Sequence, residues 1–237
     1  MLLSTFSIVA RDDNGLLGVA VTSRVLAVGA FCPHVREGVA AVASQAYLNP
    51  YLAYDFLDQA PSSETIQARA SETLAADPGR EWRQFIAIGP EGAPYAFTGA
   101  ETDPWAGHLL GHDCAAAGNL LVGSQTVASL VDAFEGSSGS LAARLVQALQ
   151  AGQDAGGDRR GRQSAALLVK ASEQAAFVDL RVDDHPDPVP ELARLLDLLV
   201  PDFERAYQRA TSRVPRPVSE IKARQESVRA QLESKEA

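Results

Sequence analysis

The chain opens with two apolar runs that a short polar turn separates. The first run covers residues 5–10, Thr-Phe-Ser-Ile-Val-Ala, and the second covers residues 17–23, Leu-Gly-Val-Ala-Val-Thr-Ser. Asn14-Gly15 stands between them, and this dipeptide is a strong signal for a tight turn that joins two antiparallel strands. Since nearly every position in the runs is apolar or small, we predict adjacent strands that are buried on both faces.

Strand-like and helix-like segments follow each other over most of the remaining chain. Further strands are predicted at 38–44, 83–88, 93–98, 164–170 and 176–182, and helices at 52–57, 63–76, 125–134 and 141–150. Ser63 is the predicted N-cap of the second helix, and Asp77-Pro78-Gly79 is the signal that ends it. This order favours an α+β fold with a largely antiparallel sheet.

The C-terminal part has a different pattern. Apolar residues at helical spacing predict an amphipathic helix, which Pro201 kinks or splits: Leu192, Leu195, Leu196, Leu199, Phe203 and Tyr207. The charged segment 219–237 reads as a solvated helix, a frayed tail or an arm on a neighbouring subunit. We therefore divide the chain into a domain at 1–188 and a helical extension at 189–237.

The apolar stripe of this extension also bears on assembly. We expect a homo-oligomer, most simply a dimer, whose interface includes the segment after Pro188, because the stripe needs a partner surface. The alternative is that residues 192–207 cover the domain of their own chain.

Composition and charge exclude several classes of protein. With 46% hydrophobic residues the chain is not globally disordered, and a net charge of −9 without a basic stripe argues against nucleic acid or an anionic membrane as partner. No apolar run reaches the roughly 18 residues of a transmembrane helix. Two cysteines and no secretory signal indicate a reduced, cytoplasmic protein.

Metal and cysteine chemistry have weak support. His108 and His112 stand four residues apart, but a proline and two glycines around them oppose the helix that would place both on one face. Asp183-Asp184-His185 is explained by an acidic turn at the end of a strand. We therefore expect no metal ion and no cofactor. A Cys-His pair with Cys32 or Cys114 stays open, although both stand among small apolar residues, where a buried thiol is the common outcome.

The loop 156–162, Gly-Gly-Asp-Arg-Arg-Gly-Arg, precedes a buried strand. Its three guanidinium groups suit bidentate capture of a carboxylate or a phosphate. They suit equally well a set of ion pairs that tie the loop to an acidic surface. The loop lacks the Gly-Lys-Ser/Thr of a Walker phosphate-binding loop.

Thr5 stands at the head of the first predicted strand. A hydrolase that uses its own N-terminal threonine needs this layout, because the hydroxyl leads a central strand and the free α-amine serves as the base. An ordinary hairpin explains the same pattern, since threonine is common in strands.

Taken together, these segments resemble the bacterial family catalogued as domain of unknown function 1028, which in turn resembles the N-terminal nucleophile (Ntn) hydrolases in fold. The matching residues span roughly 4–200 and are Thr5–Asp12, Gly18–Val21, Ser23-Arg24, Ala27–Ala30, Gln45, Asn49-Pro50, Asp77–Arg80, Phe97–Gly99, Ala117–Leu121, Gly157–Ala166 and Val178–Pro186. The resemblance implies a four-layer α-β-β-α sandwich of Ntn-hydrolase type with a C-terminal helical extension.

The resemblance also implies a site. The catalytic residues are Thr5 as nucleophile, Ser23 beside it, and Asp158 as the support of the N-terminal amine. The substrate-binding residues are Arg24, Gln45, Asn119, Arg159 and Arg162, and an oxyanion amide lies near Gln45 or Asn119. Two features of the superfamily are missing, because Thr22 replaces the usual aspartate before Ser23 and no lysine stands where the basic residue is expected; Arg36 is the nearest candidate.

The implied function is an amidohydrolase that acts on a small amide or a peptide-like substrate. The alternative is a non-catalytic binding or assembly protein on the same fold, unprocessed at its N-terminus. A bulky Leu2 normally protects the initiator methionine from removal, so Thr5 gains a free α-amine only through another cleavage.

Overall fold

The computed structural model describes residues 2–3, for their backbone only, and residues 5–49, 51–59, 65–171, 176–199, 222–223 and 225–228. The chain divides into two compact units, Met1–Val200 and Pro201–Ala237. In the second unit, the described residues 222–223 and 225–228 are helical. The predictions made for Ser63, Pro201, Phe203 and Tyr207, and for most of 219–237, lie outside the described residues.

The predicted N-terminal hairpin is confirmed. β2 (Thr5–Arg11) and β3 (Leu17–Ser23) pair antiparallel, with Thr5 directly opposite Ser23. The turn between them uses Gly15 at a φ of 80°, a conformation that glycine adopts without strain. The register set by this turn brings the Thr5 and Ser23 side chains together at the end of the hairpin that lies away from the turn.

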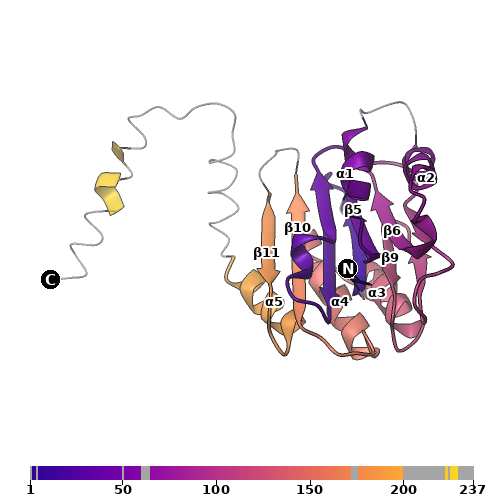
Figure 1. Cartoon of the computed structure of the whole chain (residues 1–237). Helices are drawn as coiled ribbons and strands as arrows, with labels where there is room; N and C mark the ends of the chain where they lie inside the picture. The colour runs from indigo at the N-terminus through magenta and orange to yellow at the C-terminus, as the bar shows by residue number, and fades with distance from the viewer. Residues whose placement is uncertain are drawn as a thin grey trace. The chain divides into compact units, whose positions relative to one another are not determined.

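The strands form two antiparallel sheets (Figure 1). The six-stranded sheet has the order β11-β10-β3-β2-β9-β8, with β8 at Gly107–Leu110, β9 at Cys114–Gly118, β10 at Ser164–Lys170 and β11 at Val178–Val182. The five-stranded sheet has the order β1-β5-β6-β7, and β4 also pairs with β5; these strands are β1 at Leu2–Leu3, β4 at Pro33–Arg36, β5 at Ala40–Tyr47, β6 at Arg83–Ile88 and β7 at Tyr95–Thr98.

Helices cover the outer face of each sheet. α1 (Tyr51–Asp58) and α2 (Ile66–Ala76) pack on the five-stranded sheet, and α3 (Gln125–Gly136), α4 (Leu141–Asp154) and α5 (Pro188–Asp197) pack on the six-stranded sheet. Two short 3-10 helices, η1 (Val28–Ala30) and η2 (Arg80–Trp82), stand in the connections. The described part of the chain is thus a mixed α+β fold.

The inner faces of the two sheets pack on each other. This inner core joins Val9 and Val21 of the six-stranded sheet to Ile86 and Ile88 of the five-stranded sheet. Because successive side chains of a strand point to opposite faces, Phe6 and its alternate neighbours in β2 face the helices instead. The strands are therefore apolar on both sides, as the sequence pattern predicts.

Several boundaries and elements differ from the sequence predictions. The helix predicted at 63–76 begins at Ile66, and the side chain of Thr65 caps it by accepting a hydrogen bond from the Ala68 amide. The strand predicted at 38–44 runs at 40–47. Sequence reasoning missed β1, β4, β8 and β9. The first three are short, and β9 consists only of Cys-Ala-Ala-Ala-Gly, a composition with little strand preference.

α5 packs on the six-stranded sheet of its own chain. Val189 and Leu192 are fully buried there, and Leu195, Leu196 and Leu199 pack partly buried against the same core. The first unit therefore includes α5, which the division made from the sequence places in the extension 189–237. For its described residues, the apolar stripe that begins at Leu192 covers its own chain, which was the alternative to a dimer interface.

Among the residues that the structure describes, no helix has both the length and the apolar character needed to cross a membrane.

Candidate functional site

Polar side chains gather at one end of the layer between the two sheets. Strand alternation points Thr5 and Ser7 of β2 in the same direction as Val9, into this layer. From the facing sheet, Gln45 of β5 and Gln84 of β6 point into it as well. All four side chains are at most 1% exposed. Away from this end the layer is apolar, so the polar group is a local feature.

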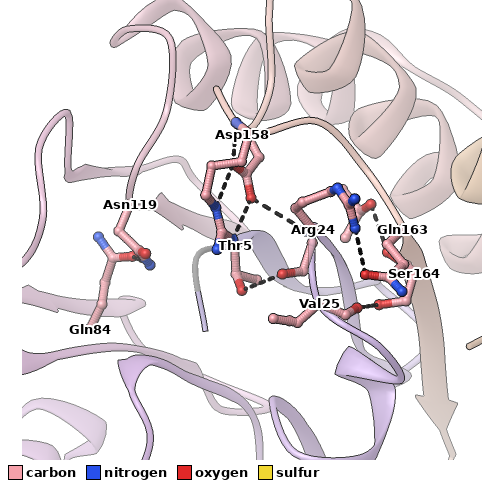
Figure 2. A network of polar contacts seen from close by, with 11 residues as sticks. Thr5, Arg24, Val25, Gln84, Asn119, Asp158, Gln163 and Ser164 are labelled. Carbon is pink, nitrogen blue, oxygen red and sulfur yellow. Dashed lines mark hydrogen bonds and ion pairs between the residues drawn. The ribbon is translucent and has the colours of Figure 1, made fainter. Parts of the chain in front are cut away.

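Thr5 is held by contacts from two strands. Its Oγ1 donates a hydrogen bond to Ser23 Oγ at 3.3 Å, which follows from the register of β2 and β3 (Figure 2). Its backbone carbonyl accepts a hydrogen bond from the Asn119 amide at 3.0 Å. The nucleophile predicted from the sequence is therefore fixed both at its side chain and at its backbone.

Asp158 lies beside this hydroxyl pair. Its Oδ2 accepts a hydrogen bond from the Arg24 amide at 3.3 Å, and Arg24 directly follows Ser23 in the chain. Its Oδ1 accepts one from the Arg160 amide at 2.9 Å, and the Arg160 guanidinium pairs with Oδ2 at 3.0 Å. A backbone bridge between Leu121 and Asp158 joins the loop 156–162 to the segment that follows β9.

Asn119 and Gln45 meet through Gln84, which sequence reasoning missed. Gln84 Oε1 accepts hydrogen bonds from Gln45 Nε2 at 2.6 Å and from Asn119 Nδ2 at 3.2 Å. Gln45 Oε1 in turn accepts one from the Ser7 hydroxyl at 2.7 Å. The signal for Gln84 was present in the sequence, because it is a polar residue at the alternation position of Ile86 and Ile88.

The structure thus brings together five residues that are far apart in the sequence: Thr5, Ser23, Gln45, Asn119 and Asp158. They form two connected groups, with the hydroxyl pair and Asp158 on one side and the amide group around Gln84 on the other (Figure 2). The backbone bond from Asn119 to Thr5 joins the two groups. All five side chains are buried, Asp158 being the most exposed at 6%.

The arginines predicted to bind substrate differ in their partners. Arg162 forms an ion pair with Asp187 at 2.6 Å, so its charge is compensated within the chain. Arg24 and Arg159 instead bond to uncharged groups: Arg24 Nη1 donates to Gln163 Oε1 at 2.7 Å, and Arg159 Nη2 donates to the Leu121 carbonyl at 3.3 Å. The sequence left two roles open for the arginines of loop 156–162, capture of an anionic ligand or ion pairing within the chain. Arg160 and Arg162 form ion pairs, with Asp158 and Asp187 respectively.

Two non-glycine residues with left-handed backbone conformations flank the site. Ala46 follows Gln45 with a φ of 70°, and Leu120 follows Asn119 with a φ of 52°. Such conformations cost free energy and reorient the adjacent amides. On the Asn119 side the amides are in use, since Asn119 bonds to the Thr5 carbonyl and Leu120 to the Asp103 carbonyl. On the Gln45 side, Gln45 and Ala46 pair with β6, and Ala46 also pairs with β1, so both places predicted for an oxyanion amide stay predictions.

The two cysteines are poor nucleophiles. Burial raises the pKa of the Cys32 thiol far above its ordinary value, although the Ser44 amide partly offsets this. Burial also raises the pKa of Cys114 to about 12, with a smaller contribution from Glu135. Because the thiolate is the reactive form, we expect both thiols to be unreactive at neutral pH. Among the described residues, no group of three or more His, Cys, Asp and Glu side chains is placed to hold a metal ion.

A partly buried ion pair supports the end of β5 that carries Ala46. Arg83 Nη1 donates to the Tyr47 carbonyl at 2.7 Å, and Arg83 Nε donates to Asp77 Oδ2 at 2.9 Å. Asn49 also donates to Asp77. Burial alone would raise the pKa of Asp77, but hydrogen bonds from Arg83, the Gly79 amide and Asn49 hold it below its ordinary value. The Asp77–Arg83 pair therefore acts on the site through the backbone.

We expect Asp77→Asn to lower the free energy of unfolding by about 3 kcal/mol at pH 7, because it leaves the Arg83 charge without its partner. The folded pKa of Asp77 is lowered, so its contribution is present above the unfolded value of about 3.9 and is lost as the pH falls through the folded value. Urea unfolding from pH 7 to pH 3 should show the variant converging on the wild type. Asp58→Asn, in an exposed pair with Arg36, is the control and should change little. A gap that stays constant with pH would contradict this role of Asp77.

Comparison with known proteins identifies the family of the chain. The family model of DUF1028, described as a family of unknown function, matches residues 5–192, which contain every residue of the site. The chain belongs to the DUF1028 family. The resemblance deduced from the sequence is thereby confirmed.

Solved structures extend this comparison. The DUF1028 chain is similar to protein SPO2555 from Silicibacter pomeroyi, itself assigned to DUF1028, with 29% identity over 90% of this chain and 92% of that chain and a TM-score of 0.79. It has a weaker similarity to Anbu (ancestral beta-subunit) from Yersinia bercovieri, with 11% identity over 90% of this chain and 99% of that chain and a TM-score of 0.38. No curated protein sequence matches the chain.

Proposed function

We propose that this DUF1028 protein is an amidohydrolase of the N-terminal nucleophile type, on the four-layer α-β-β-α sandwich of that superfamily. The observation that carries the proposal is the environment of Thr5. Its hydroxyl heads a central strand, bonds to Ser23 at 3.3 Å and lies next to the buried carboxylate of Asp158. A small amide or a peptide-like molecule is the proposed substrate, and the proposed location is the cytoplasm.

In the proposed reaction, the Thr5 hydroxyl attacks the carbonyl carbon of the amide. The α-amine of Thr5, once free, takes the hydroxyl proton and passes it to the leaving amine, so that the C–N bond breaks and an ester forms on Thr5. Water then adds to the ester and releases the acid. Ser23 orients the hydroxyl, and Asp158 supports the protonated amine by its negative charge.

The proposed oxyanion donor is a backbone amide at Gln45–Ala46. The left-handed φ of Ala46 is the supporting observation, because it turns the end of β5 out of regular strand geometry. Peptide-like substrates are supported by β1, in which Leu2 and Leu3 pair antiparallel with Tyr47 and Ala46. This edge of β5 therefore accepts an extended backbone at the level of the candidate site.

A specific observation favours the second candidate, a non-catalytic binding or assembly protein. With β1 paired to β5, the Thr5 side chain is completely buried, and its backbone nitrogen is part of a peptide bond. A chain that keeps residues 1–4 has neither a free amine nor an accessible hydroxyl. The two candidates therefore differ in whether the chain is cut before Thr5.

Capture of the proposed ester tests the activity. A β-lactone acylates a nucleophilic hydroxyl and leaves a stable adduct, which tryptic mass spectrometry locates. We expect the adduct on the peptide that begins at Thr5. Amide turnover accompanied by an adduct on Cys32, or by none at all, would contradict the proposal.

For assembly we retain the proposal of a homodimer with an interface that includes residues after Pro188. Light scattering of the full-length chain should give twice the mass of 25.1 kDa. Because α5 packs on its own chain, the informative truncation ends at Val200 rather than at Pro188. A monomeric full-length chain would refute the dimer.

A further inference from the structure

The described residues hold the guanidinium group of Arg24 in place, and none of them pairs a carboxylate with its charge. Its Nη1 donates to the side-chain carbonyl of Gln163 at 2.7 Å, and no other described residue bonds to the guanidinium. Gln163 is itself fixed, since its Nε2 donates to Asp184 Oδ1 at 3.0 Å and its amide donates to the Ser23 carbonyl at 2.9 Å. An uncharged carbonyl thus fixes the direction of Arg24, and Asp184 acts only through Gln163.

The neighbouring arginines show that this arrangement is local. Arg160 is paired with Asp158 and Arg162 with Asp187, each through a carboxylate. Arg159, like Arg24, bonds only to an uncharged carbonyl among the described residues. Although the chain carries a net charge of −9, no carboxylate of a described residue pairs with the exposed guanidinium groups of Arg24 and Arg159, two residues that adjoin Asp158.

Arg24 stands one residue from the proposed catalytic hydroxyls. It follows Ser23, and its amide bonds to Asp158; Figure 2 draws its side chain between Thr5 and Gln163. Gly161, at a φ of 106°, lies against its stem, because a Cβ there would come 3.6 Å from Arg24 Cδ. The residue as a whole is exposed. The residue is thus preorganised to receive a ligand from solvent.

We propose that Arg24 binds a carboxylate of the substrate, so that the preferred substrates are amides that carry a carboxylate near the scissile bond. With Nη1 held by Gln163, the remaining Nε and Nη2 edge presents two parallel N–H groups, which match the two oxygens of one carboxylate. This inference rests on the proposed amidohydrolase function and names its substrate class. Arg24 acts by binding and takes no part in proton transfer.

Binding of small probes tests the inference without turnover. In NMR titrations of the full chain, we expect N-acetylglycine, which carries a carboxylate, to bind about tenfold more tightly than neutral N-acetylglycinamide. Arg24→Gln should remove this preference. Arg194→Gln, which removes an exposed guanidinium on α5, is the matched control and should retain it.

Three results would overturn the inference: equal binding of the two probes, an unchanged preference in Arg24→Gln, or inorganic phosphate binding at Arg24 more tightly than N-acetylglycine, which would assign the residue to phosphate. A Thr5→Ala chain that is inert towards amides but retains Arg24-dependent binding of N-acetylglycine would leave this inference standing. The failure of the proposed function is therefore distinguishable from the failure of the carboxylate site.

Discussion

Thr5→Ala should reduce amide turnover by at least about 10³-fold in the chain that begins at residue 5, because it removes the atom that forms the ester. The environment of the residue predicts the size of the effect. Thr5 Oγ1 forms a hydrogen bond with Ser23 Oγ at 3.3 Å and with no other side chain of the described residues. The two cysteines offer no substitute thiolate, because burial raises the pKa of both thiols. Turnover is measured as release of the amine product.

Two further variants separate chemistry from folding. Thr5→Val keeps the shape of the side chain and should be as inactive as Thr5→Ala, whereas Thr5→Ser keeps a hydroxyl and should retain measurable turnover. Cys32→Ala and Cys114→Ala should stay largely active. Full activity in Thr5→Ala would transfer the nucleophile to another residue and end the proposal.

Gln84→Ala should lower the free energy of unfolding by about 3 kcal/mol, the largest loss of stability that we expect from an uncharged residue of the site. Besides its two accepted bonds, Gln84 Nε2 donates to Thr98 Oγ1 at 2.9 Å and to the carbonyls of Gly107 and Gly118 at 3.0 and 2.9 Å. Truncation leaves a cavity and several buried polar groups that lose this partner, each costing about 1–3 kcal/mol unless the site rearranges.

Gln67→Ala is the matched control for this variant. Gln67 bonds to the carbonyls of Ala93 and Pro94 near the surface, where water can replace its amide. Its removal should change the free energy of unfolding by less than about 0.5 kcal/mol in denaturant titrations. A loss below about 1 kcal/mol in Gln84→Ala would show that the amide group around it is not a structural centre of the site.

The sequence predicted the parts of the fold that local signals determine. Asn14-Gly15 and the two apolar runs were sufficient to predict the hairpin but not its register. The observed loop spans residues 13–15, with the Asp12 amide bonded to the Leu16 carbonyl, and this register places Thr5 opposite Ser23. Longer helices with clear apolar faces, such as α3 and α4, were also predicted. The error at α2 arose because Ser63 and Thr65 are both residues that suit an N-cap, and the cap lies at Thr65. The predicted β5 was placed two residues too early, because Gly38-Val39 precede the strand, and it stopped three residues too soon, because Gln45 interrupts the apolar run.

Other parts depend on contacts between distant segments. β9, with three alanines, is a strand because β2 and β8 pair with it on either side, and its own composition carries no such signal. Gln84 is central because Gln45 and Asn119 reach it from other elements. Arg162 has a carboxylate partner because Asp187 lies beside it, whereas Arg24 meets the uncharged side chain of Gln163. No local sequence pattern predicts the positions of these partners.

The mass of the mature chain tests the central claim most directly. Intact-mass and N-terminal peptide measurements on protein purified from its native host should show Thr5 as the first residue, because only a cut before Thr5 supplies the α-amine that the proposed reaction uses as its base. A mature chain that retains residues 1–4 would contradict the account and favour the binding or assembly protein.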